Sequence, residues 1–153
     1  MAKHIEEYDS NGLARVYDNA QWYLIDKDSN QVTEAYSYIE EWGEGYYKAE
    51  QGAKKNILRP DGSVVLNQWY NDVFKVQHGF FIFGNTIRKS KTNPKTRYIQ
   101  GVAHVSGIIV FPMIFERTQW CEDGKAIYAE IDEKPYILTL DGSIYDPAHS
   151  HLP

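Results

Sequence analysis

The chain has 153 residues and a formal net charge of −5, with 42% hydrophobic and 24% charged residues. This length suits one domain with a sizeable core, and the composition is ordinary for a soluble globular protein. Residues 1–50 hold eleven acidic and four basic residues, which argues against a nucleic-acid-binding surface there. Cys121 is the single cysteine, so no disulfide can form within the chain. The N-terminus lacks an apolar signal segment and no apolar run could span a membrane, so we expect a cytoplasmic location and no membrane partner.

Aromatic residues are abundant, with twelve tyrosines, six phenylalanines and four tryptophans, and they favour strands. Taken in chain order, four glycines each open an alternating apolar segment: Gly12, Gly45, Gly79 and Gly124. Four turn positions each close the following segment: Ser29, Gly62, Gly107 and Gly142. The spacings are 33, 34 and 45 in the first series and 33, 45 and 35 in the second. They agree if one insertion lies between Gly79 and Gly107, and such a fixed period predicts a repeat architecture.

Two further markers follow the same period. An apolar residue stands five positions before each turn residue: Leu24, Ile57, Val102 and Ile137. An aromatic residue begins each of three connecting segments: Tyr36, Tyr70 and Phe115. We interpret Asp61-Gly62 and Asp141-Gly142 as primed hairpin turns, because glycine adopts positive φ at little cost. The connecting segments, residues 36–42, 70–76 and 115–121, allow either a single helical turn or an irregular buried connection.

These markers predict an all-β chain of about four repeats, each a three-stranded antiparallel meander with short connecting turns. We expect one domain over residues 1–147, with units of about 5–35, 36–69, 70–114 and 115–147, followed by a linker or tail over residues 148–153. The repeats would form an array, and the sequence leaves propeller-like, solenoid and barrel arrangements open.

Residues 21–29, QWYLIDKDS, carry the repeat motif most fully. This motif resembles the core of the WG-repeat family, K-W-G-L-I-D-x-x-G, and departs from it at Tyr23 and Ser29. Other positions match the family glycine, the family proline and the aromatic connection: Gly101, Pro112, Pro147 and residues 70–73. The resemblance covers about residues 12–147. It implies a non-catalytic repeat scaffold, the N-terminal repeat region of a longer bacterial protein of unknown function, with the linker leading to a further domain.

The sequence contains no P-loop, G-x-S-x-G, H-E-x-x-H or dinucleotide-binding glycine pattern. His149 and His151 form an H-x-H pair without a third or fourth metal ligand, so we predict no metal site and no cofactor. Cys121 occupies an apolar position of the repeat, and we expect it to be buried. The leading hypothesis is therefore a non-enzymatic binding or scaffolding module whose partner is a protein or an adjoining domain.

The insertion in the third repeat supports an alternative, a binder of a phosphorylated or anionic ligand, or an enzyme acting on one. It contains five basic residues, no acidic residue and one flanking aromatic: Arg88, Lys89, Lys91, Lys95, Arg97 and Tyr98. A basic loop of this kind can meet phosphate, nucleic acid or an acidic partner. The simpler interpretation is a solvated extension of a hairpin.

The aromatic residues suggest a third possibility, an exposed platform that binds a carbohydrate or a peptide. Eight residues could form it: Trp22, Tyr23, Trp42, Tyr46, Tyr47, Trp69, Tyr70 and Trp120. The simpler interpretation is that most of them build the core.

Overall fold

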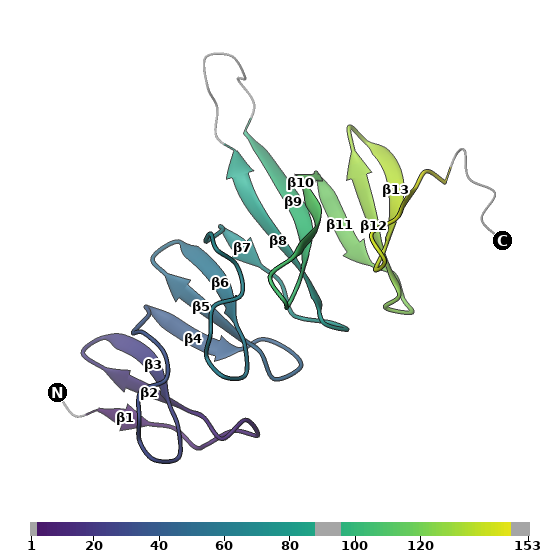
Figure 1. Ribbon diagram of the computed structural model, residues 1–153. Coiled ribbons are helices and arrows are strands. Elements are labelled where there is room, and N and C mark those ends of the chain that lie inside the picture. The colour runs from purple at the N-terminus through teal and green to yellow at the C-terminus, as the bar shows by residue number, and fades with distance from the viewer. Residues whose placement is uncertain (1–2, 88–95, 148–153) are drawn as a thin grey trace. The chain divides into compact units, whose positions relative to one another are not determined.

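The structure is a computed structural model that describes residues 3–87 and 96–147 (Figure 1). These residues form four small antiparallel sheets and no helix, which confirms the all-β prediction. The chain forms two compact units, Met1–Val76 and Gln77–Pro153. The predicted linker over residues 148–153, with the H-x-H pair, lies outside the described residues.

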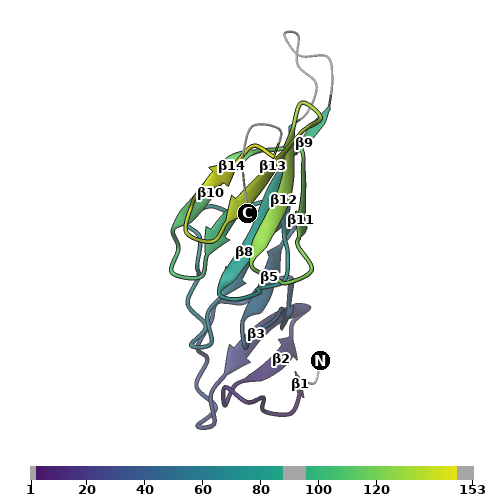
Figure 2. The same cartoon turned by 90° about the vertical axis from the view of Figure 1, so that its right-hand side faces the viewer.

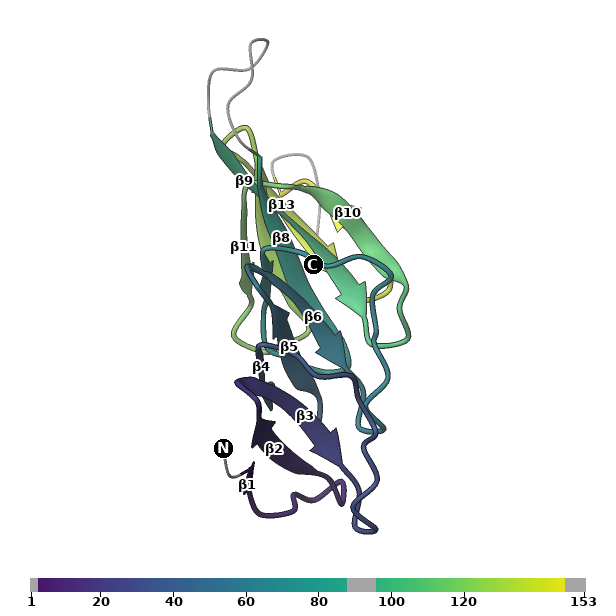
Figure 3. The same ribbon diagram turned by 90° about the vertical axis from the view of Figure 1, so that its left-hand side faces the viewer.

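The first unit contains two three-stranded sheets (Figure 3). The first has the order β1-β2-β3, formed by β1 (His4–Ile5), β2 (Ala14–Asp18) and β3 (Gln21–Ile25). The second has the order β4-β5-β6, formed by β4 (Tyr38–Glu41), β5 (Tyr47–Gln51) and β6 (Lys54–Leu58). A two-residue strand, β7 (Asp72–Val73), follows in the same unit.

The second unit also contains two sheets (Figure 2). In one, β8 (Phe80–Ile87) pairs with β9 (Arg97–His104), which pairs with β10 (Ile109–Phe115). The other has the order β11-β12-β13-β14, formed by β11 (Arg117–Trp120), β12 (Ala126–Ile131), β13 (Lys134–Thr139) and β14 (Ile144–Tyr145). The connecting segments in which the sequence allowed a helical turn therefore contain the strands β4, β7 and β11.

Four hairpin turns share one pattern of hydrogen bonds, which the turn over residues 9–13 also shows. In each turn the N–H of the first residue donates to the carbonyl of the residue four positions later. The carbonyl of the first residue accepts a hydrogen bond from the N–H of the residue three positions later. These first residues are Asp26, Arg59, His104 and Thr139. The residue three positions on has a positive φ in every case: Ser29, Gly62, Gly107 and Gly142. These are the four turn positions that the sequence predicts.

The predicted turn type is wrong. Asp61 and Asp141 do not have positive φ, so neither Asp-Gly pair forms a type I′ turn, and both belong to three-residue loops that end in a left-handed residue. The Asp61 carboxylate instead accepts a hydrogen bond from the Ser63 N–H at 2.9 Å. Two-residue loops with both residues at positive φ occur at Asn19-Ala20 and Asp132-Glu133, where the sequence carries no Asn-Gly or Asp-Gly signal.

The aromatic residues that begin two of the connecting segments pair with the preceding hairpin. Tyr36 exchanges two backbone hydrogen bonds of 2.7 Å with Trp22, and Tyr70 exchanges bonds of 2.6 and 3.0 Å with Lys55. In the second unit Phe115 lies opposite Gln100 in the β9–β10 ladder. In all three cases the aromatic residue therefore lies opposite the second strand of the preceding hairpin.

Each unit has its own apolar core. In the first unit the largest cluster of buried residues is Leu13, Leu24, Tyr36, Ile39, Tyr47, Ala49 and Leu58. In the second unit it is Ile82, Val102, Phe111, Phe115, Ile127, Ala129 and Leu138. Full burial of one such aliphatic or phenylalanine side chain contributes roughly 1.5–3 kcal/mol. Both clusters contain residues of two sheets, so the two sheets within each unit pack against each other through these side chains.

Candidate functional site

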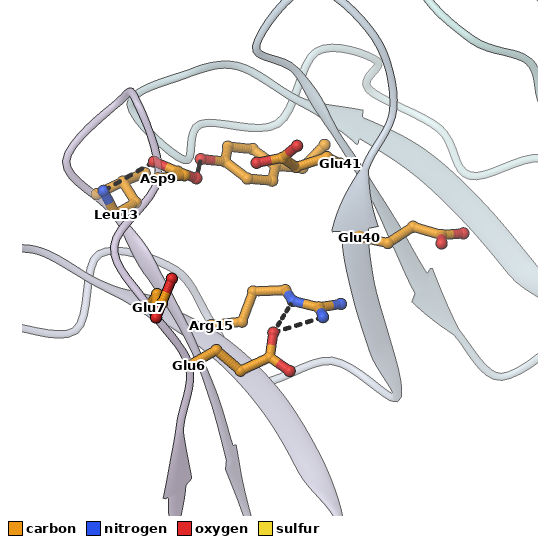
Figure 4. A pocket seen from close by; sticks show the side chains of 8 residues that line it. Glu6, Glu7, Asp9, Leu13, Arg15, Glu40 and Glu41 are labelled. Carbon is orange, nitrogen blue, oxygen red and sulfur yellow. Dashed lines mark hydrogen bonds and ion pairs between the residues drawn. The ribbon is translucent and has the colours of Figure 1, made fainter.

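The first unit contains an acidic cavity of about 260 Å³ between its two sheets (Figure 4). Residues of the first sheet and of the loop after β1 form one side, and residues of β4 and β5 form the other. Five carboxylates and one guanidinium line it, with Leu13 and Tyr47: the charged residues are Glu6, Glu7, Asp9, Arg15, Glu40 and Glu41. The lining therefore carries a formal charge of −4.

Arg15 crosses from the first sheet to the second. Its Nη2 lies 2.5 Å from Oε1 of Glu6, and its Nε donates to the same oxygen at 2.7 Å. Its Nη1 donates to the carbonyl of Ile39 on β4 at 2.7 Å. The guanidinium also lies 4.9 Å from the ring centroid of Trp22, within the range of a cation–π contact. Arg15 is thus held by Glu6 and by the sheet itself, and it neutralises only one of the five carboxylates.

Asp9 and Tyr47 form a second link across the cavity. The Tyr47 hydroxyl donates to Oδ2 of Asp9, while Oδ1 of Asp9 accepts from the N–H groups of Asn11 at 2.9 Å and Leu13 at 3.0 Å. The Asn11 amide nitrogen donates to the Tyr47 hydroxyl at 3.0 Å. Burial raises the pKa of Tyr47, and the hydrogen bond to Asp9 raises it further. The Tyr47 hydroxyl is therefore a neutral donor that holds the Asp9 carboxylate in place.

The remaining three carboxylates differ in their partners. Glu40 pairs with Lys48 at 2.9 Å, and Lys48 also lies 3.4 Å from Glu50. Within residues 3–87 and 96–147, no side chain forms a hydrogen bond or an ion pair with Glu7 or Glu41. Both side chains are exposed. The cavity can therefore hold a cation from outside the chain without displacing an internal one.

The described residues contain no group of three or more His, Cys, Asp or Glu side chains arranged to bind a metal ion. An ammonium or guanidinium group needs hydrogen-bond acceptors rather than fixed coordination, and the carboxylates of the cavity are such acceptors.

Only two of the six residues predicted at the basic insertion are described. Arg97 is the first residue of β9 and lies opposite Ile87, and Tyr98 lies opposite Thr86. A Cβ atom added at Gly84 would lie 2.7 Å from the Tyr98 hydroxyl, so the tyrosine side chain lies over that glycine. Arg88, Lys89, Lys91 and Lys95 lie outside the described residues. Their role in binding stays a prediction.

The other predicted candidates have structural contacts. All eight aromatic residues proposed for an exposed platform are buried or half-buried, which favours a packing role. His104 contacts the hydroxyl of Ser106 at 2.9 Å and the ring of Phe80 at 4.9 Å. Cys121 is half-buried rather than buried, because it lies at the end of β11 where the chain enters a turn.

Sequence reasoning missed the acidic cavity. The one signal that could have indicated it is the excess of acidic residues in residues 1–50. The motif search could not find it, because its carboxylates come from segments more than thirty residues apart and share no spacing.

Comparison with models of protein families and with curated proteins finds no match to this chain. The part of the chain that the structure describes has no helix with the length and hydropathy needed to cross a membrane.

Proposed function

We propose that the chain is a non-enzymatic β-repeat module that binds a basic segment of a protein partner through the acidic cavity of its first unit. The observation that carries this proposal is a pair of carboxylates, Glu7 and Glu41, that have no partner in the described part of the chain. They lie beside a wall already held by the bonds of Arg15 and Tyr47. A site whose walls are fixed before binding loses less conformational entropy when the ligand arrives.

The charge of the first unit agrees with a basic partner. Residues 1–76 contain thirteen acidic and eight basic residues, whereas residues 77–153 contain eight of each. The resulting charge of −5 on the first unit would accelerate the approach of a basic segment at low ionic strength.

The recurrence of one turn pattern in four sheets supports the repeat part of the proposal. We propose four repeats in a propeller-like or solenoid array, related to the WG-repeat family, with the domain boundaries that the sequence predicts. Small-angle X-ray scattering tests the arrangement, because a solenoid is longer than a compact propeller of the same mass.

The binding proposal is tested with a synthetic eight-residue peptide of alternating lysine and threonine and with its glutamate counterpart. We expect saturable binding of the lysine peptide only, weakening with added salt. The double variant Glu7→Gln, Glu41→Gln should bind it about 2- to 30-fold more weakly, because each exposed ion pair contributes roughly 0.2–1 kcal/mol. The matched control is Glu34→Gln, which removes an exposed carboxylate from the same unit outside the cavity. Equal binding by all three proteins would overturn the proposal.

A second candidate function is binding of a phosphorylated or anionic ligand by the basic insertion. The observation that favours it is the position of the insertion, which connects two eight-residue strands, β8 and β9. In contrast, the β2–β3 and β12–β13 hairpins are connected by loops of only two residues. Replacing Arg88, Lys91 and Lys95 by glutamine should abolish binding of inorganic phosphate or of a single-stranded oligonucleotide at low salt. Unchanged binding would exclude this function.

A further inference from the structure

The second unit contains a cavity of about 330 Å³ beside β11. It is lined by Gln100 on β9, by the four consecutive residues 116–119, and by Tyr128 and Glu130 on β12. All of these residues belong to the second unit.

The lining of this cavity places it along the edge of β11. Successive side chains of a strand point to opposite faces, so a cavity on one face would be lined by alternate residues only. Residues 116–119 line it without a gap. β11 is also the first strand in the order β11-β12-β13-β14, and it pairs with β12 alone among the described strands. The cavity therefore lies beside the outer edge of β11, where an edge strand presents backbone N–H and C=O groups that no other described strand pairs with.

Gln100 supplies a hydrogen-bond donor to this cavity. The residue is 7% exposed, and its Oε1 accepts a hydrogen bond from the Thr118 hydroxyl at 2.9 Å. Its amide nitrogen, Nε2, has no hydrogen-bond partner within residues 3–87 and 96–147. Buried polar groups are usually hydrogen-bonded, so an amide donor beside a cavity without a partner indicates a ligand that carries an acceptor.

A comparison with the first unit shows that this edge differs from its counterpart. Ile39 lies opposite Ala49 in the β4–β5 ladder, and Thr118 lies opposite Ala129 in the β11–β12 ladder. The Ile39 carbonyl accepts a hydrogen bond from Arg15. The Thr118 carbonyl receives no side-chain hydrogen bond from any described residue. The edge of β4 is thus covered by a side chain, whereas no side chain of residues 3–87 or 96–147 bonds to the matching carbonyl of β11.

An adjoining cavity of about 410 Å³ gives this edge its charge. It is lined by three carboxylates and one guanidinium: Glu116, Glu130, Glu133 and Arg117. The excess of carboxylates favours a basic side chain next to the edge. The exposed ring of Tyr128, on the β12 strand that pairs with β11, offers apolar contact to the aliphatic stem of such a basic side chain.

We propose that the free edge of β11 binds an extended basic segment of a protein partner as an added β-strand, with Nε2 of Gln100 donating to a backbone carbonyl of that segment. Main-chain hydrogen bonds to β11 would supply affinity, and the carboxylates of Glu116, Glu130 and Glu133 would select lysine or arginine at alternate positions. The proposal rests on the proposed function only in that the partner is a protein with a basic segment.

The experiment uses the intact chain and the lysine–threonine peptide, with a matched peptide N-methylated at alternate backbone amides. The methyl groups remove main-chain donors but keep the charge and the side chains. In ¹H–¹⁵N spectra the first peptide should shift the side-chain amide signal of Gln100 and the backbone signals of residues 117–120. The N-methylated peptide should bind at this edge at least ten-fold more weakly. Gln100→Met keeps the side-chain volume. It should lower the affinity for the first peptide, as measured from the shifts of residues 117–120, about three- to thirty-fold.

Each other outcome overturns the inference in a way that separates it from the proposed function. Shifts confined to residues near Glu7 and Glu41 would support the acidic cavity and exclude the β11 edge. Equal binding of both peptides would show charge attraction without strand addition. Shifts of Gln100 and Tyr128 by maltotriose, and not by the peptide, would make the site a saccharide site. If Gln100→Met does not fold, the comparison of the two peptides on the intact chain still shows whether the segment binds by strand addition.

Discussion

The hydroxyl of Tyr47 donates a hydrogen bond to the carboxylate of Asp9, a residue 38 positions earlier in the chain. Tyr47 belongs to β5 of the second sheet, and Asp9 belongs to the loop between β1 and β2 of the first. Asn11 strengthens the link, because its amide donates both to the Tyr47 hydroxyl and to the carbonyl of Gly45, at 3.0 and 2.8 Å. This contact joins the two sheets at the acidic cavity.

Replacing Tyr47 by phenylalanine should therefore lower the free energy of unfolding. A hydrogen bond to a charged group contributes about 1.5–3 kcal/mol, and the Asp9 carboxylate would lose one of its donors. The measurement is urea unfolding at pH 7. The control is Tyr46→Phe at the neighbouring residue, whose hydroxyl makes no hydrogen bond within the described residues and whose loss should change stability by less than about 0.5 kcal/mol. Equal effects of the two substitutions would contradict the role of the link.

The same tyrosine should make the protein sensitive to alkaline pH. Burial raises the pKa of Tyr47 above its ordinary value of 10.0, and the hydrogen bond to Asp9 adds to the shift. Above pH 10 the unfolded chain releases this proton while the folded chain retains it, so the stability from this group is complete below pH 10 and falls as the pH rises further.

Denaturant unfolding between pH 9 and pH 11 checks this expectation. The loss for one such group approaches about 1.4 kcal/mol per pH unit. Burial also raises the pKa of Tyr36 and of Tyr70, so some loss will remain in Tyr47→Phe. The variant should nevertheless show a shallower decline than the unmodified chain. Parallel curves would mean that the Tyr47 proton is not held more tightly in the folded state.

Gly62 and Gly52 lie in two different turns of the first unit, and their replacement by alanine should have unequal costs. Gly62 has a φ of 89°, and a Cβ atom there would lie 2.9 Å from Cγ2 of Thr33. Gly52 has a φ of 63°, and no atom lies within 4 Å of its added Cβ. Gly62→Ala combines backbone strain of roughly 1–3 kcal/mol with a steric conflict, whereas Gly52→Ala involves strain alone. Thermal unfolding should show the lower midpoint for Gly62→Ala, and a lower midpoint for Gly52→Ala would contradict this account.

Much of the fold could be predicted from the sequence because the turns depend on local chemistry. Ser29 and the three glycines at 62, 107 and 142 mark left-handed backbone positions, and all four have positive φ. The turn type could not be read in the same way, because Asp-Gly is compatible with both a two-residue and a three-residue loop. The hydrogen bonds that decide between them run from Arg59 to Ser63 and from Thr139 to Ser143, outside the dipeptides themselves.

The acidic cavity could not be predicted, since it depends on which segments meet in space. Glu6 and Glu7 lie after β1, while Glu40 and Glu41 lie on β4, and nothing in their spacing indicates that they share a cavity. Alternation along a strand tells which face a side chain occupies but not which sheet lies opposite. The same limit applies to Gln100, which occupies the position of Trp22 in the repeat and yet lines a cavity with a buried polar side chain.

The aspartates in three of the four turns should make the protein sensitive to acid. Hydrogen bonds lower the pKa of three of them below the ordinary value of 3.8: the Asn30 N–H acts chiefly on Asp26, the Ser63 hydroxyl on Asp61 and the Thr139 hydroxyl on Asp141. As the pH falls below 3.8 the unfolded chain takes up these protons first, so the stability from these groups is complete above that pH and is lost as the pH falls through the folded-state pKa values.

Substitution by asparagine separates this titration from the turn geometry. An asparagine carbonyl oxygen still accepts the backbone hydrogen bonds but has no carboxyl proton. The triple variant Asp26→Asn, Asp61→Asn, Asp141→Asn should therefore keep its strands by circular dichroism at pH 7. Its free energy of unfolding should fall less steeply than that of the unmodified chain between pH 5 and pH 2. Asp28→Asn is the matched control, because it removes a carboxylate of the same turn that accepts no hydrogen bond from any described residue. If the triple variant declines as steeply as the unmodified chain, the turn carboxylates do not retain their charge through these hydrogen bonds.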